Sequence, residues 1–123
     1  MVQQEVLEQL PNERLAIFSV WEPILRTDDA ASARKATTLF QDPRVENFWV
    51  ETQDVGELFQ SAIDLETEPA WDVYLVYPRG TMWTDEAPPR PEYFMHQLGG
   101  RLPDESMFDG PVLARKLKDS LRR

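Results

Sequence analysis

Residues 71–77 form the most continuous apolar run of the chain, interrupted only by Asp72. Pro69 leads into this run, and a Pro-Arg-Gly turn at residues 78–80 ends it. A short apolar run between turn-forming residues is typical of a strand buried on both faces under flanking helices. The pattern therefore predicts a central strand and an α/β fold around it.

Four other segments have the apolar spacing of amphipathic helices. Asp54 and Glu57 have the spacing of a capping box, and Asp109 followed by Pro111 is a typical helix start. Small residues in the second helix would let it lie close to the sheet. The predicted helices cover residues 2–10, 30–40, 54–63 and 110–121.

The remaining apolar segments predict the other strands. Residues 15–21 are apolar enough for a second buried strand, whereas residues 45–50 mix polar and apolar positions as an edge strand does. Residues 81–83 are expected to start an antiparallel partner of the central strand, which residues 93–98 would resume. Residues 84–92 are polar and rich in proline, so we expect a loop inserted in this hairpin.

Length and composition limit the possible functions. A chain of 123 residues is expected to form a single domain, covering residues 1–123. The formal net charge of −9 makes nucleic acids and anionic membranes unfavourable partners. No apolar stretch approaches the roughly 20 residues of a membrane span, so a cytoplasmic protein is expected. The sequence contains no cysteine, which excludes disulfides and thiol nucleophiles.

The order of these elements resembles the layout of the thioredoxin-like superfamily, in particular peroxiredoxins and membrane-anchored thiol-disulfide oxidoreductases. In those families a cis-proline immediately precedes the strand that leads into the hairpin, and Pro69 matches that placement. The segment from Phe18 to Asp28 is similar to the second strand and its polar turn. The resemblance implies a three-layer α/β/α domain with a mixed sheet of about four strands, in which the usual first strand is missing.

Two departures from that family shape the functional expectation. The family's reaction depends on a cysteine thiolate, so no thiol chemistry is possible here. The missing first strand would lie between the strand at residues 15–21 and the one at 71–77. Either those two strands pair directly or another chain fills the gap. Exposed strand edges would then favour a homodimer.

A few polar residues are weak candidates for other chemistry. If the hairpin brings His96, the single histidine, beside Asp72, the carboxylate could orient the imidazole as a general base. A hydrogen-bonded histidine and a capping aspartate are the simpler interpretation of both. A metal site would need Asp28 and Asp29 together with these two residues, and this spacing matches no known site. We therefore expect no metal and no cofactor.

Large aromatic side chains are a better indication of function than the charges. Many of them lie near the proline-rich loop and the interrupted hairpin, and an aromatic patch is typical of protein interfaces. The sequence thus favours a redox-inactive module that binds a protein partner or itself. A non-thiol enzyme using Asp72 and His96, and a truncated or degenerate relative without activity, are the alternatives. The expected binding residues are Trp21, Pro69, Trp71, Trp83 and Tyr93.

Overall fold

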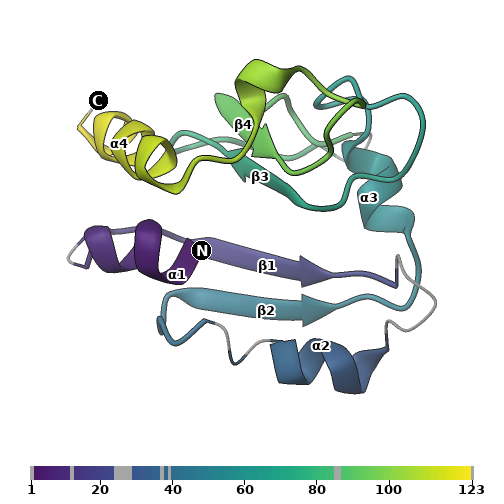
Figure 1. Ribbon diagram of the computed structural model, residues 1–123, viewed down its shortest axis with the longest axis horizontal. Helices are drawn as coiled ribbons and strands as arrows, with labels where there is room; N and C mark the ends of the chain where they lie inside the picture. The colour runs from purple at the N-terminus through teal and green to yellow at the C-terminus, as the bar shows by residue number, and fades with distance from the viewer. Residues whose placement is uncertain are drawn as a thin grey trace.

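The structure is a computed structural model that describes residues 2–11, 13–23, 29–36, 38, 40–84 and 87–122. It is a small α/β protein whose elements follow the predicted order (Figure 1). In chain order these are α1 (Val2–Glu5), the 3₁₀ turn η1 (Leu7–Gln9), β1 (Ile17–Trp21), α2 (Ala30–Ala36), β2 (Val45–Trp49), α3 (Asp54–Phe59), β3 (Val73–Val76), β4 (Tyr93–His96), the 3₁₀ turn η3 (Asp104–Ser106) and α4 (Gly110–Leu121).

The strands form two two-stranded sheets. β1 and β2 are parallel, with Ile17 opposite Val45, and α2 provides the crossover between them. β3 and β4 are antiparallel, with Val73 opposite His96. The expected single sheet of about four strands is therefore divided, because β1 and β3 are not hydrogen-bonded neighbours. Both pairs are joined by local connections, a crossover helix and a hairpin, and these determine which strands pair.

The predicted central strand is found in part: both faces of β3 pack on apolar clusters, but its side chains are half-buried and β4 is its one paired neighbour in the described part of the chain. Tyr74 and Val76 of β3 pack on a first core cluster, whereas Val73 and Leu75 pack on a second one. Successive side chains of a strand point to opposite faces, so β3 lies between the two clusters. The buried residues of the first cluster are Val6, Leu7, Leu10, Met95, Leu113 and Ala114, and those of the second are Ile63, Leu65, Ala70, Leu98 and Leu102.

Helix α4 lies beyond one end of the β3–β4 pair, above α1 (Figure 1). In the same view the β3–β4 pair is above β1, while α2 lies below β2. Helix α4 begins as predicted, since the Asp109 side chain accepts a hydrogen bond from the Val112 amide and Pro111 occupies the first turn. This cap satisfies an amide that has no partner within the helix.

Two local expectations were wrong, the N-cap of α3 and the strand at residues 81–83. Asp54 is not the N-cap of α3: Gln53 is, and its side chain makes no capping bond. Instead, the Glu22 carboxylate at the end of β1 accepts from the Gly56 amide, so a distant residue does the work of a local cap. Residues 81–83 form no strand. The Glu68–Pro69 peptide bond, whose isomer the sequence leaves open, is trans, whereas the resembled families have a cis-proline at this place.

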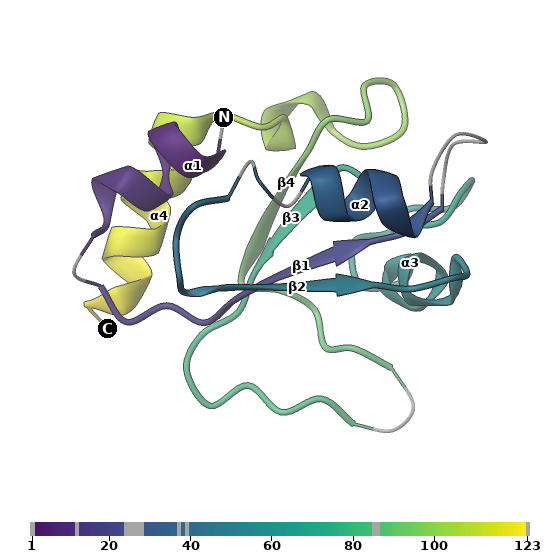
Figure 2. The ribbon, with the colours of Figure 1, turned by 90° about the horizontal axis from the view of Figure 1, so that it is seen from below.

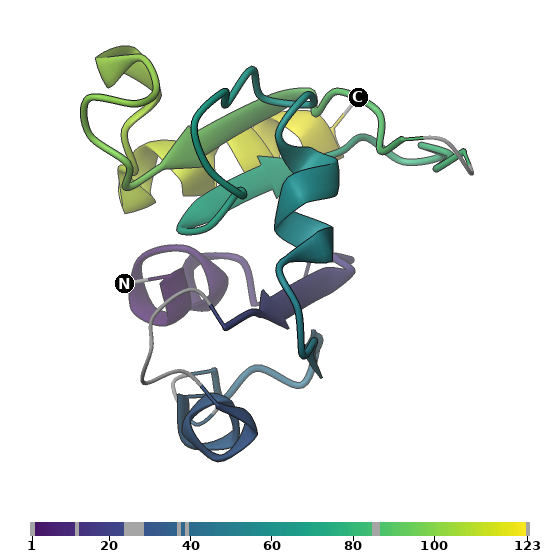
Figure 3. The same cartoon turned by 90° about the vertical axis from the view of Figure 1, so that its right-hand side faces the viewer.

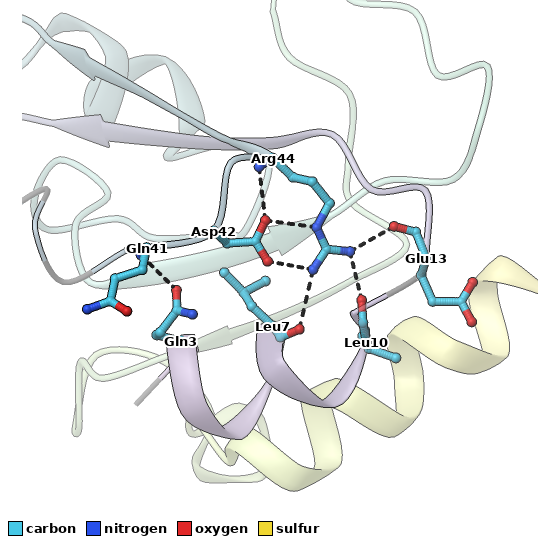
Figure 4. Close-up of polar contacts among 7 residues, drawn as sticks. All are labelled: Gln3, Leu7, Leu10, Glu13, Gln41, Asp42 and Arg44. Atoms are coloured by element: carbon cyan, nitrogen blue, oxygen red, sulfur yellow. Dashed lines mark hydrogen bonds and ion pairs between the residues drawn. The ribbon is translucent and has the colours of Figure 1, made fainter.

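Arg44 fastens the N-terminal helical segment to the start of β2 (Figure 4). Its guanidinium donates hydrogen bonds to the carbonyls of Leu7, Leu10 and Glu13 at 3.3, 2.8 and 2.7 Å. Asp42 holds the guanidinium from the other side, with Arg44 Nε 2.9 Å from Oδ1 and Nη2 2.6 Å from Oδ2. One side chain thus binds three carbonyls of η1 and the turn after it, two of which, those of Leu7 and Leu10, also accept backbone hydrogen bonds.

Candidate functional site

The β1–β2 sheet has one face that is open to solvent and apolar. Phe18 is 61% exposed, Val20 43% and Phe48 47%. Val20 and Phe48 are opposite each other in the register, and the rings of Phe18 and Phe48 are 6.3 Å apart. These three side chains therefore form one patch, which we call the outer face.

The opposite face of the same sheet is covered. Ile17 and Val45 pack against the first core cluster, and the Trp21 ring is 6.4 Å from that of Phe40. Because side chains alternate along a strand, burying Ile17 and Trp21 directs Phe18 and Val20 outward. Soluble chains rarely expose several large apolar side chains together without a function for them.

The proline-rich loop extends on the same side as the outer face. In Figure 2, α2 lies on one side of the β1–β2 sheet and residues 77–84 and 87–92 extend on the other. Figure 3 shows the same arrangement from the side. Phe40, which follows α2, packs on the inner face, so the loop and the outer face share the opposite side. Trp83 in this loop is 54% exposed and rests edge-on against Phe59, with ring centroids 5.2 Å apart.

The loop is tied to the body at several points. Tyr77 donates a hydrogen bond from its hydroxyl to the Pro89 carbonyl at 2.9 Å, and the Glu92 amide donates to the Val76 carbonyl at 2.8 Å. Arg90 makes two hydrogen bonds to Asp64, at 3.0 and 2.6 Å. The exposed Trp83 is consequently carried by an anchored segment.

The carboxyl end of β1 meets the segment around Pro69 through α3. Glu22 accepts from the Gly56 amide at 2.5 Å, and the Gly56 carbonyl accepts from the Ala70 amide at 2.9 Å. Burial of the Glu22 carboxylate raises its pKa, the bond from Gly56 opposes that rise, and the charge of Glu57 adds to it. The end of β1 and the segment after Pro69 therefore meet at α3.

The expected binding residues lie in different surroundings. Trp83 is exposed, whereas the other four are half-buried. Trp21 faces inward, and its ring nitrogen donates to the Asn47 side chain at 3.1 Å. Trp71 packs on the second core cluster. Pro69 lies beside the α3 junction, and Tyr93 lies near α4, so the structure does not gather these residues into one groove.

Tyr93 lines a separate hollow of about 650 Å³ between β4, η3 and α4. Lys116 lies over its ring, 5.1 Å from the centroid. Burial raises the pKa of the Tyr93 hydroxyl, and the charge of Asp119 raises it further. Cationic and anionic side chains both line the hollow, including Arg90, Asp104 and Glu105. This mixed lining favours no particular ligand.

His96 is fully buried and its ring is used by the backbone. Nδ1 accepts from the Leu98 amide at 3.0 Å, and Nε2 lies 2.8 Å from the Pro103 carbonyl. Because a carbonyl can only accept, Nε2 must carry the proton in this arrangement. Neither nitrogen is left for the Asp72 carboxylate or for a substrate proton, so the general-base pair of the alternative hypothesis is not assembled.

Asp72 has a structural setting of its own. Its φ of 49° is in the left-handed region, and its carbonyl accepts from the Gln97 amide at 2.9 Å at the edge of the hairpin. Partial desolvation raises the pKa of its carboxyl group. Asp28 of the four-residue metal hypothesis lies outside the described residues. Within the described part of the chain, no group of three or more metal-binding side chains is arranged to hold an ion.

No helix in the described ranges combines the length and the apolar character needed to cross a membrane. Comparisons with protein families, with curated proteins and with solved structures found no match to this chain.

Sequence reasoning missed the outer face. All of residues 15–21 except Ser19 are apolar, so the run predicted burial on both sides rather than alternation. The signal was present in the partner strand, because an edge strand with Glu46 and Phe48 on one face must leave that face partly in water. A parallel neighbour of such a strand shares the same face.

Proposed function

We propose that this chain is a protein-binding module whose docking surface is the outer face of the β1–β2 sheet. The main support is that Phe18, Val20 and Phe48 are exposed together on a sheet whose other face packs against the core. Aromatic and aliphatic side chains presented on a rigid element form the desolvated centre of typical interfaces. Trp83, in the loop on the same side of the sheet, adds a large exposed ring.

We further propose a thioredoxin-like arrangement without thiol chemistry. Its support is the order of elements: a parallel β1–α2–β2 unit, α3, Pro69, an antiparallel hairpin and a final helix. The trans bond at Pro69 and the division into two sheets are departures from that arrangement. The absence of cysteine makes binding, rather than redox exchange, the activity to test.

The test is a selection of binders from a displayed random peptide library on the wild-type protein. Peptides that use the outer face should lose at least about tenfold in affinity for the F18S/F48S double variant, because truncating an interface centre typically costs more than about 1.4 kcal/mol. M107S is the matched control, since Met107 is a similarly exposed side chain on a different surface. The selected peptides should bind M107S with the same affinity as the wild type.

Circular dichroism and the free energy of unfolding would show that both variants fold. Sedimentation of the protein alone would show whether a second copy occupies the face, as a dimer that F18S/F48S dissociates. Peptides that bind the double variant and the wild type equally well would refute the proposed surface.

A further inference from the structure

We infer that the partner of the outer face is a basic polypeptide segment, in which lysines or arginines flank large apolar side chains. This inference rests on the proposed function. It follows from the distribution of charge around the face and from what a second copy of the chain can offer.

The sequence from β2 to β3 is acidic throughout. Residues 45–78 contain eight carboxylates and neither lysine nor arginine. Asp64 and Glu68 are bound by Arg90 and Arg101. The other six are exposed, and no ion pair within the described residues neutralises them: these are Glu46, Glu51, Asp54, Glu57, Glu66 and Asp72.

Four of these carboxylates, Glu46, Glu51, Asp54 and Glu57, lie on β2, on α3 or between them. Glu46 is opposite Phe18 in the parallel register, so its side chain points to the same side of the sheet as the two phenylalanines. Glu51, Asp54 and Glu57 follow at the carboxyl ends of the strands, where α3 lies (Figure 2). Glu22 follows Phe18 and Val20 in the alternation of β1, and the charge of Glu57 raises the pKa of its carboxyl group. An apolar centre with a negative rim is complementary to an apolar segment with a positive rim.

A second copy of the chain does not fit this description. Each copy carries a formal charge of −9, so two copies repel each other. Its concentrated basic surface is on α4, where Arg115, Lys118 and Arg122 are exposed. The apolar side of α4, with Leu113 and Ala114, is already buried in the first core cluster. A second copy therefore cannot present basic and apolar side chains together.

The experiment uses the peptides selected on the wild-type protein and asks about their charge. We expect binders that depend on Phe18 and Phe48 to be enriched in lysine and arginine. The triple variant E46Q/E51Q/E57Q should weaken their binding about tenfold, since each rim ion pair contributes a few tenths of a kcal/mol to about 1 kcal/mol. Raising the salt concentration from about 0.05 M to about 0.3 M should weaken wild-type binding in the same direction.

The matched control is E8Q/D104N/E105Q, which changes the net charge equally at exposed positions away from β2 and α3. It should bind as the wild type does. Binders that require Phe18 and Phe48 but are neutral or acidic, or that respond equally to both triple variants, would overturn this inference and leave the proposed function standing. A dimer formed through the outer face would also overturn the inference of a basic partner while leaving the proposed function standing. If the affinity of all selected binders is independent of Phe18 and Phe48, both the proposed function and this inference are refuted.

Discussion

At the scale of single residues, Arg44 is the side chain on which most polar contacts converge. Its guanidinium binds three carbonyls of the N-terminal segment and both oxygens of Asp42 (Figure 4). Nothing in the spacing of Asp42 and Arg44 along the sequence shows that this arginine reaches back to Leu7. The contact depends on tertiary structure, which is why sequence reasoning did not find it.

Replacing Arg44 by alanine should lower the free energy of unfolding by about 2–3 kcal/mol, because three carbonyls and a carboxylate lose a half-buried partner. Arg79→Ala, at an exposed turn position, should change it by less than about 0.5 kcal/mol. Urea unfolding of both variants measures the difference. Equal values for the two variants would show that the Arg44 contacts contribute nothing net.

Asp42 should give this region a specific pH dependence. The hydrogen bonds from Arg44 hold the pKa of Asp42 below its usual value. A depressed pKa means that the ionised form stabilises the fold at neutral pH, and that this contribution is lost as the pH falls below about 3.9 toward the lower folded-state value. The stability difference between the wild type and Asp42→Asn should therefore be constant near neutrality and shrink in acid. A difference that persists at the lowest pH would contradict this assignment.

His96 is expected to act through stability rather than chemistry. His96→Phe would leave the Leu98 amide and the Pro103 carbonyl without partners in the core, at a cost of about 2–4 kcal/mol. His96→Gln offers an acceptor and a donor on one side chain and should recover part of that loss. Thermal and urea unfolding of the two variants test the order. Full stability in His96→Phe would show that the ring is not a structural bridge.

At the scale of elements, α3 connects the end of β1 with the segment after Pro69. Gly56 is where these three parts meet, and a Cβ atom there would lie 2.7 Å from the Ala70 carbonyl and 2.8 Å from a Glu22 oxygen. Gly56→Ala should therefore destabilise the protein by about 1–3 kcal/mol despite the better helix propensity of alanine. Gly99→Ala is the control, because a Cβ at Gly99 meets nothing within 4 Å. If Gly56→Ala leaves the free energy of unfolding unchanged, the neighbouring backbone and the Glu22 side chain can move to accommodate the added Cβ atom.

The elements themselves were largely predictable from the sequence. The helix at α4 and the strands at β1, β2, β3 and β4 follow from apolar spacing and from their bounding prolines and glycines. The capping box failed because Glu22, distant in sequence, takes the amide that a local cap would bind. The strand at residues 81–83 failed because Trp83 packs on Phe59 instead of pairing with β3.

At the scale of the whole molecule, β3 and β4 connect the two core clusters. Tyr74 and Met95 belong to the first cluster, and Leu75 and Phe94 to the second. Leu10→Ala and Leu98→Ala, one in each cluster, should each cost about 2–5 kcal/mol and shift the same single unfolding transition. Circular dichroism and tryptophan fluorescence followed together test this. Two separated transitions would mean that the clusters unfold independently.

The candidate site was less predictable than the fold. Aromatic content directed attention to binding surfaces, but four of the five chosen residues are half-buried. Exposure of Phe18 and Phe48 is set by which face of the β1–β2 sheet the core covers, and that choice depends on contacts with Val6, Leu10 and Phe40 far along the chain. A composition or spacing rule cannot decide it.

The bond between the Tyr77 hydroxyl and the Pro89 carbonyl closes the proline-rich segment at its base. The exposed turn at Gly80, whose φ of 82° suits glycine, lies beyond that closure. A foreign sequence spliced between Gly80 and Thr81 would thus be insulated from the hydrophobic interior. It could carry a fluorophore or an affinity tag close to Trp83, and a change in the fluorescence would then signal the binding of a partner.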